Sequence, residues 1–179
     1  MKIYFLLNHV YDFNAQEFCK KHIGDHEISY GIVLPNNPEF FDLIIPWNYK
    51  KILRDCKLHN VIIFHSSDLP KGKGWAPIFN VFHRQLEEYV VSAIFLDEEV
   101  DSGNIIAQCR FKMRNTYTAE FIRRIDEEVT IMMIAEILKK MKEKELTGSK
   151  QDKKQETYYA RRYPRDNEVD INSTLASLV

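Results

Sequence analysis

The sequence predicts an α/β protein with a mostly parallel sheet, a C-terminal antiparallel hairpin and a long C-terminal helix. Three observations support this class. The first half contains short apolar runs of strand length, two later runs are joined by a link too short for a crossover helix, and one long amphipathic pattern follows. With 179 residues and 21.2 kDa, the chain has the size of a single domain with its own core.

The strands of the first half are continuously apolar. They are expected at residues 2–7, 28–34, 41–45 and 61–64. Apolar strands of this kind are typical of a parallel sheet that is covered on both faces. Short helices are expected between them, at residues 14–21, where Asn14 is the cap, and at residues 50–56.

The second half begins with a helix over residues 76–86, which is followed by strands at 90–96 and 105–111. Only residues 97–104 separate these strands, so the two should pair as an antiparallel hairpin. The longest helix is expected over 118–144, because apolar residues recur there at helical spacing. We expect this stripe to face the core; it consists of Ile122, Ile125, Val129, Met132, Met133, Ile137 and Met141.

The composition changes after Glu145. LTGSKQDKKQ is polar and is expected to be a flexible connection, whereas TYYARRYPRDNEVD regains aromatic residues. We therefore divide the chain into an α/β domain at residues 1–146 and, at residues 147–179, a polar linker and C-terminal tail that packs on the same domain. Arg161 and Arg162 of the tail fit either a bound phosphate or the acidic residues beside them.

The bulk composition excludes several classes of protein. A formal net charge of −1 gives no basic surplus, so no nucleic-acid partner is expected. No apolar run reaches the roughly 20 residues of a membrane span, and MKIYFLLNHVYDF at the start indicates a strand, not a leader peptide. Cys19, Cys56 and Cys109 form no metal-ligand or redox motif. We expect no metal, no membrane association, and free thiols in the cytoplasm.

Two loops carry candidate chemistry. His65 follows the apolar run 61–64, at the edge where open α/β sheets bind ligands, and Asp101 lies in the link of the predicted hairpin. If both loops share that edge, the carboxylate can orient the imidazole for proton transfer. The alternative is a hydrogen-bonded structural histidine beside an ordinary Asp-Ser-Gly turn. The glycines within residues 71–74 lack the spacing of a Walker loop.

The segments around these two residues resemble a known family. HSSDLPKGKGWAP at 65–77 and VDSGNII at 100–106 resemble the folate-dependent formyltransferases, which include methionyl-tRNA, glycinamide-ribonucleotide and nucleotide-sugar N-formyltransferases. FDLIIPWNYKKIL at 41–53 and the tail TYYARRYPRDNEVD are similar to further segments of that family. The pattern looks most like the sugar N-formyltransferases and methionyl-tRNA formyltransferase-like proteins. It implies a Rossmann-like three-layer formyltransferase fold with a shortened N-terminal part.

The resemblance implies transfer of a formyl group from N10-formyltetrahydrofolate to an amine, for which the amino group of a nucleotide-linked amino sugar is suitable. His65 would be the acid/base and oxyanion donor, and Asp101 its partner. The folate contacts would be Pro46, Trp47, Asn48, Tyr49, Leu96, Glu99 and Val100. The acceptor contacts would be Ser67, Lys71, Lys73 and Trp75. The partners are thus small molecules, and a homodimer is left open.

The sequence departs from the family at one position of the site. The family has an asparagine two residues before the histidine, and Ile63 stands there. Along an extended strand, Asn60 lies roughly 16 Å from His65, whereas Asn48 or Asn104 can approach from other loops. An uncompensated loss of an oxyanion donor costs about 10²–10³ in rate. A non-catalytic folate- or sugar-binding module and a formyl-folate hydrolase are therefore the alternatives.

Overall fold

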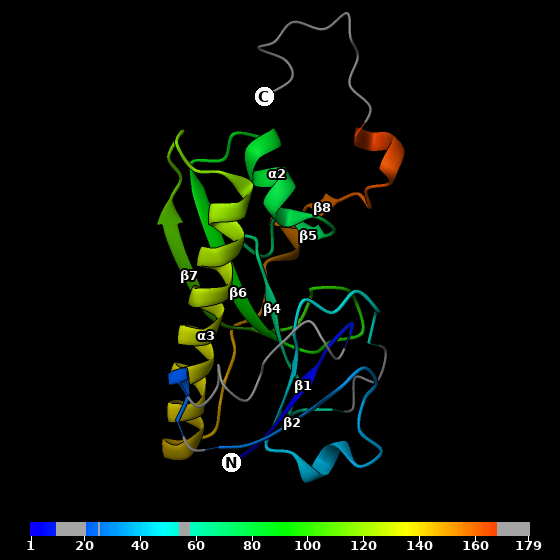
Figure 1. The fold of residues 1–179 in the computed structure, drawn as a ribbon, viewed down its shortest axis with the longest axis vertical. Helices are drawn as coiled ribbons and strands as arrows, with labels where there is room; N and C mark the ends of the chain where they lie inside the picture. Colours follow the sequence, from blue (N-terminus) through cyan, green and yellow to red (C-terminus); the bar gives the residue numbers. More distant parts are fainter. Residues whose placement is uncertain (10–20, 25, 54–57, 168–179) are drawn as a thin grey trace, which may run out of the picture.

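The computed structural model describes residues 1–9, 21–24, 26–53 and 58–167 (Figure 1). The strands there are β1 (Lys2–Leu6), β2 (Glu27–Gly31), β3 (Leu43–Pro46), β4 (Ile62–His65), β5 (Lys73–Gly74), β6 (Glu88–Phe95), β7 (Ile105–Lys112) and β8 (Tyr158–Tyr159). The helices are α2 (Pro77–His83) and α3 (Ala119–Glu143), with 3-10 turns η1 (Pro38–Phe40), η2 (Lys153–Gln155) and η3 (Pro164–Asn167). The helix expected at 14–21 lies almost entirely outside the described residues.

The central sheet has a parallel half and an antiparallel half. β1 lies between β2 and β3, and both pairs are parallel. A parallel bridge between Ile44 and Val61 joins β3 to β4. β4 pairs with β6, and β6 pairs with β7, both in antiparallel orientation. The predicted α/β class, the parallel strands and the antiparallel hairpin are confirmed, and the antiparallel half also includes β4.

Alternate strand residues pack into two clusters on opposite faces of the sheet. On β1, Ile3 and Phe5 are buried on the face that α3 covers, while Tyr4 and Leu6 are buried on the other face. β4 alternates in the same way, which directs His65 to the face opposite α3. The candidate site therefore lies on the side of the sheet that the long helix leaves open.

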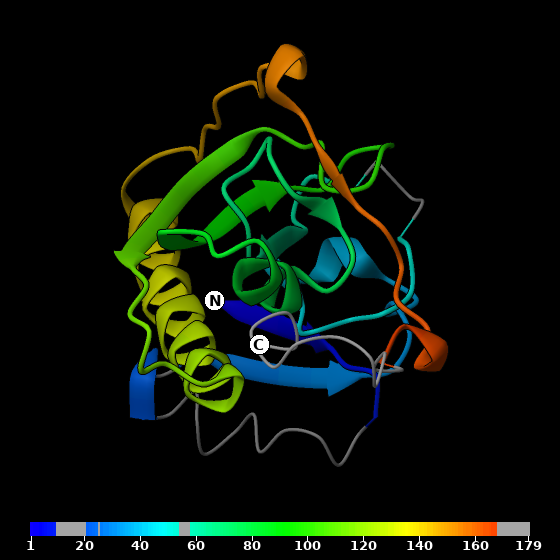
Figure 2. The same cartoon turned by 90° about the horizontal axis from the view of Figure 1, so that it is seen from above.

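Helix α3 packs along β6 and β7 (Figures 1 and 2). It begins after Thr118, whose hydroxyl accepts a hydrogen bond from the backbone N–H of Phe121, so the predicted helix is confirmed. Its apolar stripe is buried or half-buried except at Met132, which is 61% exposed because one residue along the helix turns it away from the buried Met133. The helix expected at 50–56 is absent from its described part, residues 50–53.

The described part of the C-terminal tail, residues 147–167, runs along the side of the molecule away from α3 (Figures 1 and 2). Ser149 forms an antiparallel bridge with Ile105, and β8 lies parallel to β5. The polar segment that we expected to be a flexible connection is thus hydrogen-bonded to the sheet, while the domain boundary at residue 146 stays a prediction. Within the described ranges, no helix is long and apolar enough to cross a membrane.

Candidate functional site

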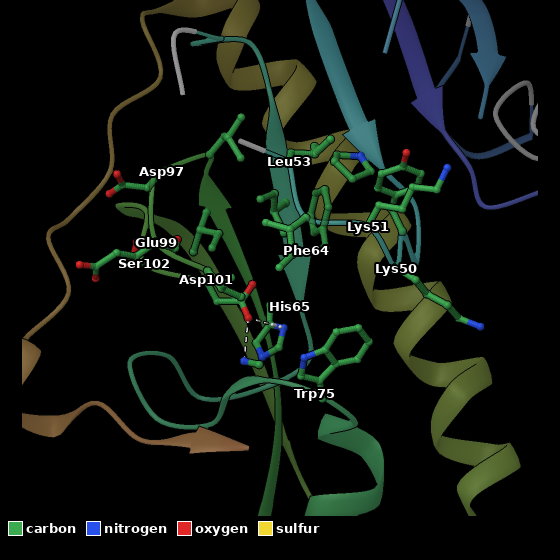
Figure 3. Close-up of a pocket in the computed structure, with 18 of the residues that line it drawn as sticks. Lys50, Lys51, Leu53, Phe64, His65, Trp75, Asp97, Glu99, Asp101 and Ser102 are labelled. Atoms are coloured by element: carbon green, nitrogen blue, oxygen red, sulfur yellow. Dashed lines mark hydrogen bonds and ion pairs between the residues drawn. The ribbon is translucent and has the colours of Figure 1, made fainter. Parts of the chain in front are cut away.

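A cavity of about 380 Å³ opens at the ends of β3 and β4 (Figure 3). Its walls come from the segment after β3, the end of β4, the residues between β5 and α2, and the link between β6 and β7. Open α/β sheets bind ligands at the carboxyl ends of their parallel strands, which is where β3 and β4 end. The volume lies within the range of pockets for small molecules.

His65 and Asp101 meet at this cavity (Figure 3). Nδ1 of His65 lies 3.5 Å from Oδ2 of Asp101, and their side chains are only 9% and 10% exposed. The other ring nitrogen, Nε2, lies 2.8 Å from the carbonyl oxygen of Gly72. Because a carbonyl oxygen can only accept a hydrogen bond, Nε2 carries the proton that faces Gly72, and Nδ1 faces the Asp101 carboxylate. The arrangement can hold a proton at the wall of the cavity and exchange it with a ligand.

Asp101 is placed by the tight path of the β6–β7 link. Its φ of +54° lies in the left-handed region, which aspartate tolerates better than most residues. Its Oδ2 accepts a 2.8 Å hydrogen bond from the N–H of Gly74. Two residues further on, a Cβ at Gly103 would overlap the carbonyl oxygen of Phe95, so the backbone requires glycine there. These constraints direct the carboxylate toward His65.

Ile63 lines the cavity, at the position where the resemblance implies asparagine. Asn60 directs its amide to two backbone carbonyls near η1, at 2.9 and 2.7 Å. Asn48 lines the cavity, whereas Asn104 is exposed and outside the lining. Of the two asparagines expected to approach from other loops, the structure therefore places one, Asn48, at the cavity.

Most of the residues expected to contact the folate line the cavity. They are Pro46, Asn48, Tyr49, Leu96, Glu99 and Val100. Trp47 does not line it: this side chain is 9% exposed and packs edge-on to Phe5, with 6.2 Å between the ring centroids. Successive side chains of an extended segment point to opposite faces, so the residue after Pro46 enters the core under α3.

Of the residues expected to contact the acceptor, Trp75 lines the cavity and the other three do not. The hydroxyl of Ser67 is turned inward and donates to the carbonyl oxygen of Lys71, at 2.9 Å. The Lys71 side chain lies in solvent. Lys73 is 1% exposed, and its Nζ forms a 2.8 Å ion pair with Glu156, because β5 pairs with the tail.

Two groups of residues at or beside the cavity were not among the predicted site residues. Lys50, Lys51, Ile52 and Leu53 line it from the segment expected to be a helix. The guanidinium of Arg161 lies 4.6 Å from the ring centroid of Trp75, on the tail side. The apolar residues that end FDLIIPWNYKKIL were an available signal for the first group. No local pattern links Arg161 to Trp75, since the two are far apart in the chain.

A buried carboxylate lies behind the site, on α3. Oδ1 of Asp126 accepts hydrogen bonds from Ser66 Oγ and from the Tyr89 hydroxyl, both at 2.7 Å. Burial raises the pKa of Asp126, although these two hydrogen bonds and the His65 ring oppose the shift. Burial and the nearby Asp126 also raise the pKa of Tyr89. Asp126 thereby attaches the chain just after β4 to the long helix.

Comparisons with known proteins extend these observations. The formyl transferase family model matches residues 36–137. The methionyl-tRNA formyltransferase of Carboxydothermus hydrogenoformans is 32% identical over 137 residues, which cover 74% of this chain and 44% of that protein. The chain thus spans less than half the length of the curated relatives that it matches.

Solved structures share the fold. Methionyl-tRNA formyltransferase from Clostridium thermocellum matches with a TM-score of 0.79 at 23% identity, covering 99% of this chain and 80% of that one. The formyltransferase PseJ from Anoxybacillus kamchatkensis, in complex with UDP-4,6-dideoxy-4-formamido-L-AltNAc and tetrahydrofolate, matches at 0.73 and 19% identity, covering 89% of this chain and 85% of that one. The family match over more than half of the chain, together with the sequence relative, shows that this chain belongs to the formyl transferase family.

Proposed function

We propose that this protein transfers a formyl group from N10-formyltetrahydrofolate to a primary amine. The observation that carries the proposal is the His65–Asp101 contact at the wall of a 380 Å³ cavity, in a chain of the formyl transferase family. A reduced folate as donor is supported by the complex of PseJ, which contains tetrahydrofolate. Of the site residues predicted from the sequence, His65, Asp101 and those that line the cavity remain part of this proposal.

The reaction begins when the amine nitrogen attacks the formyl carbon, and the formyl oxygen gains negative charge. A protonated His65 donates a hydrogen bond to that oxygen and gives up its contact with either the Gly72 carbonyl or the Asp101 carboxylate. The negative charge of Asp101 stabilises the imidazolium. The bond between the formyl carbon and N10 of the folate then breaks, and its electron pair returns to N10. The proton lost by the amine ends on N10, which leaves a formamide and tetrahydrofolate. One fixed donor to an oxyanion is worth about 3–4 kcal/mol.

The donor fits the part of the cavity between residues 46–53 and 96–102. Apolar side chains such as Ile63 and Leu53 can cover the faces of a pterin, while Asn48 and Tyr49 supply polar groups at its edge. Asn48 is also the cavity-lining carboxamide that can donate to the oxyanion, which the aliphatic side chain of Ile63 cannot do.

We assign the acceptor to the opening beside Trp75. The exposed Arg161 guanidinium lies over this ring, so a positive charge stands beside an aromatic residue that lines the cavity. This pair suits a phosphate-bearing acceptor such as a nucleotide-linked amino sugar. Methionyl-tRNA is the second candidate, because the curated relatives are methionyl-tRNA formyltransferases. The net charge of −1 favours the smaller acceptor.

The test combines the protein with N10-formyltetrahydrofolate and a panel of acceptors: UDP- and dTDP-linked amino sugars, and methionyl-tRNA. Tetrahydrofolate formation is followed by absorbance and the formamide product by mass spectrometry. We expect His65→Ala to lower turnover by about 10³-fold, in the range for a general acid or base. His59→Ala is the matched control, because this histidine is exposed and lies outside the cavity lining.

Two results would favour the alternative functions that the sequence left open over a transferase. Formate release at the same rate without any amine would make the protein a formyl-folate hydrolase. Calorimetric binding of tetrahydrofolate without turnover on any acceptor would make it a binding module that is inactive without the asparagine. Absence of both binding and turnover would overturn the folate site itself.

A further inference from the structure

The C-terminal strap, residues 149–159, contacts both loops that carry the proposed catalytic pair. We propose that this strap is a positioning element that sets the distance between His65 and Asp101. The proposal rests on the formyl transfer proposed above, and it assigns a role to the polar segment that the sequence suggested was a flexible connection. Gln151 and Thr157 are the positioning residues.

The first attachment is to the β6–β7 link. Nε2 of Gln151 donates to the carbonyl oxygens of Asp101 and Gly103, both at 2.8 Å. Beside it, Ser149 and Ile105 exchange two backbone hydrogen bonds of 2.8 Å. Since the carbonyl of Asp101 itself is held, Gln151 acts directly on the residue whose carboxylate faces the imidazole.

The second attachment is to the loop that follows His65. Thr157 Oγ1 accepts a 2.8 Å hydrogen bond from the N–H of Gly72, whose carbonyl oxygen faces His65 Nε2. The N–H of Lys73 donates to the carbonyl of Thr157 at 2.9 Å. The next residue, Gly74, donates its N–H to Asp101. The strap therefore bonds to Asp101 directly, through Gln151, and reaches His65 through Gly72.

The glycines of this loop are required by the strap. A Cβ at Gly72 would lie 2.5 Å from the ring of Tyr159, and a Cβ at Gly74 would lie 2.7 Å from its carbonyl oxygen. Both glycines also have positive φ, +74° and +96°. Between them, the buried Lys73 ammonium is paired with Glu156 of the strap. The pattern Lys-Gly-Lys-Gly is thus a docking surface for the tail, which explains why it lacks the spacing of a phosphate loop.

Positioning of this kind should act on turnover more than on donor binding. Thr157 bonds to the loop after His65, which is not a predicted donor contact, whereas Gln151 bonds to the carbonyl of Asp101 in the link that forms one side of the donor site. Small displacements of reacting groups cost rate steeply, about 10²-fold for 1 Å. Removing the Thr157 hydrogen bond should therefore lower kcat and leave KM for the donor nearly unchanged, whereas removing the Gln151 hydrogen bonds should lower kcat and also raise that KM.

The experiment uses Thr157→Val and Gln151→Leu, which remove the hydrogen-bonding groups at little change in volume. With N10-formyltetrahydrofolate and the acceptor identified by the panel, we expect kcat to fall about 10-fold in each variant and about 100-fold in the double variant. In Thr157→Val, KM for the donor should stay within about twofold. Thr157→Ser keeps the hydroxyl and should restore kcat, and Lys154→Ala, an exposed residue of the same strap, should leave it unchanged.

A second readout needs no activity. In the unliganded protein, amide exchange measured by NMR at Gly72 reports the deleted bond itself, while Gly74 and the His65 ring resonances report whether the change reaches the pair. The proposal would be overturned if Thr157→Val left the amide exchange of Gly74, the His65 resonances and kcat unchanged. It would also be overturned if kcat fell only in proportion to the fraction of unfolded protein. If the wild type transfers no formyl group but Gly74 and His65 respond, the proposed function fails and the positioning contact stands.

Discussion

The cavity wall that carries His65 and Asp101 is attached to the rest of the fold by buried and partly buried hydrogen bonds. In the donor wall, residues 46–53, the side-chain hydrogen bonds that attach Asn48 and Lys50 are exposed. On the donor wall, Asn8 Nδ2 donates to the carbonyl of Asn48 at 2.6 Å, and Asn8 Oδ1 accepts from the N–H of Lys50 at 2.9 Å. Water competes for such contacts, so they contribute less than buried ones. The comparison indicates a fixed wall for chemistry and a more adaptable wall for binding.

The largest effect should follow from a change to the backbone of the fixed wall. Gly103→Ala places a Cβ against the carbonyl oxygen of Phe95, and we expect it to destabilise the protein by about 3 kcal/mol, the upper end for overpacking. Urea unfolding measures the loss. Gly24→Ala is the control: with open space around its Cβ, it should cost only the strain of its positive φ, about 1 kcal/mol. Equal losses at the two glycines would mean that the β6–β7 link is not tightly constrained.

The sequence predicts those parts of the cavity walls whose contacts join residues close together in the chain. Strands, hairpin and long helix are set by local patterns. His65 and Asp101 could be placed together because each stands at the end of a strand or in its short link. The burial of the Trp47 side chain follows from the alternation of side chains along a strand, if the alternation continues past Pro46.

Other errors had no local signal. The neighbours of Lys73 in the sequence predict an exposed cation. In the structure its ammonium group is buried because it forms an ion pair with Glu156 of the tail. The polar composition of residues 146–155 predicts a flexible connection, but the Gln151 amide finds two carbonyl acceptors on a link about fifty residues earlier in the chain. Such long-range pairings are absent from composition and periodicity, and they decide which polar residues line the site.

On the donor wall, the expected effect is smaller and falls on binding. Asn8→Ala removes both of its hydrogen bonds to residues 48–50, and we expect KM for N10-formyltetrahydrofolate to rise about 5-fold, equivalent to about 1 kcal/mol. kcat should change less than about twofold. Asn8→Asp keeps the acceptor for Lys50 but sets a carboxylate oxygen against the carbonyl of Asn48, so its KM should be no lower than that of Asn8→Ala. A larger fall in kcat than rise in KM would show that the donor wall also orients the reacting groups.

The smallest effect should be a pH-dependent gain in the free energy of unfolding when Asp126, the buried carboxylate behind the site, is replaced by asparagine. Burial raises the pKa of Asp126 above its ordinary 3.8, so the folded protein holds this proton more tightly than the unfolded chain does. The stability linked to this group is therefore fully present below pH 3.8 and is lost as the pH rises through the raised pKa. Asp126→Asn stays neutral and can still accept from Ser66 and Tyr89 through its amide oxygen.

The quantity to measure is the free energy of unfolding of Asp126→Asn minus that of the wild type, from urea titrations at a series of pH values above 3.8. We expect this difference to increase with pH through the raised pKa and then to level off. Glu127 is the neighbour to control, because burial and Asp126 both raise its pKa. A Glu127→Gln background should therefore retain the rise. A difference that does not vary with pH would mean that the pKa of Asp126 is the same in the folded and unfolded states. The hydrogen bonds from Ser66 and Tyr89 would then be accepted by an ionised carboxylate and not by a neutral acid.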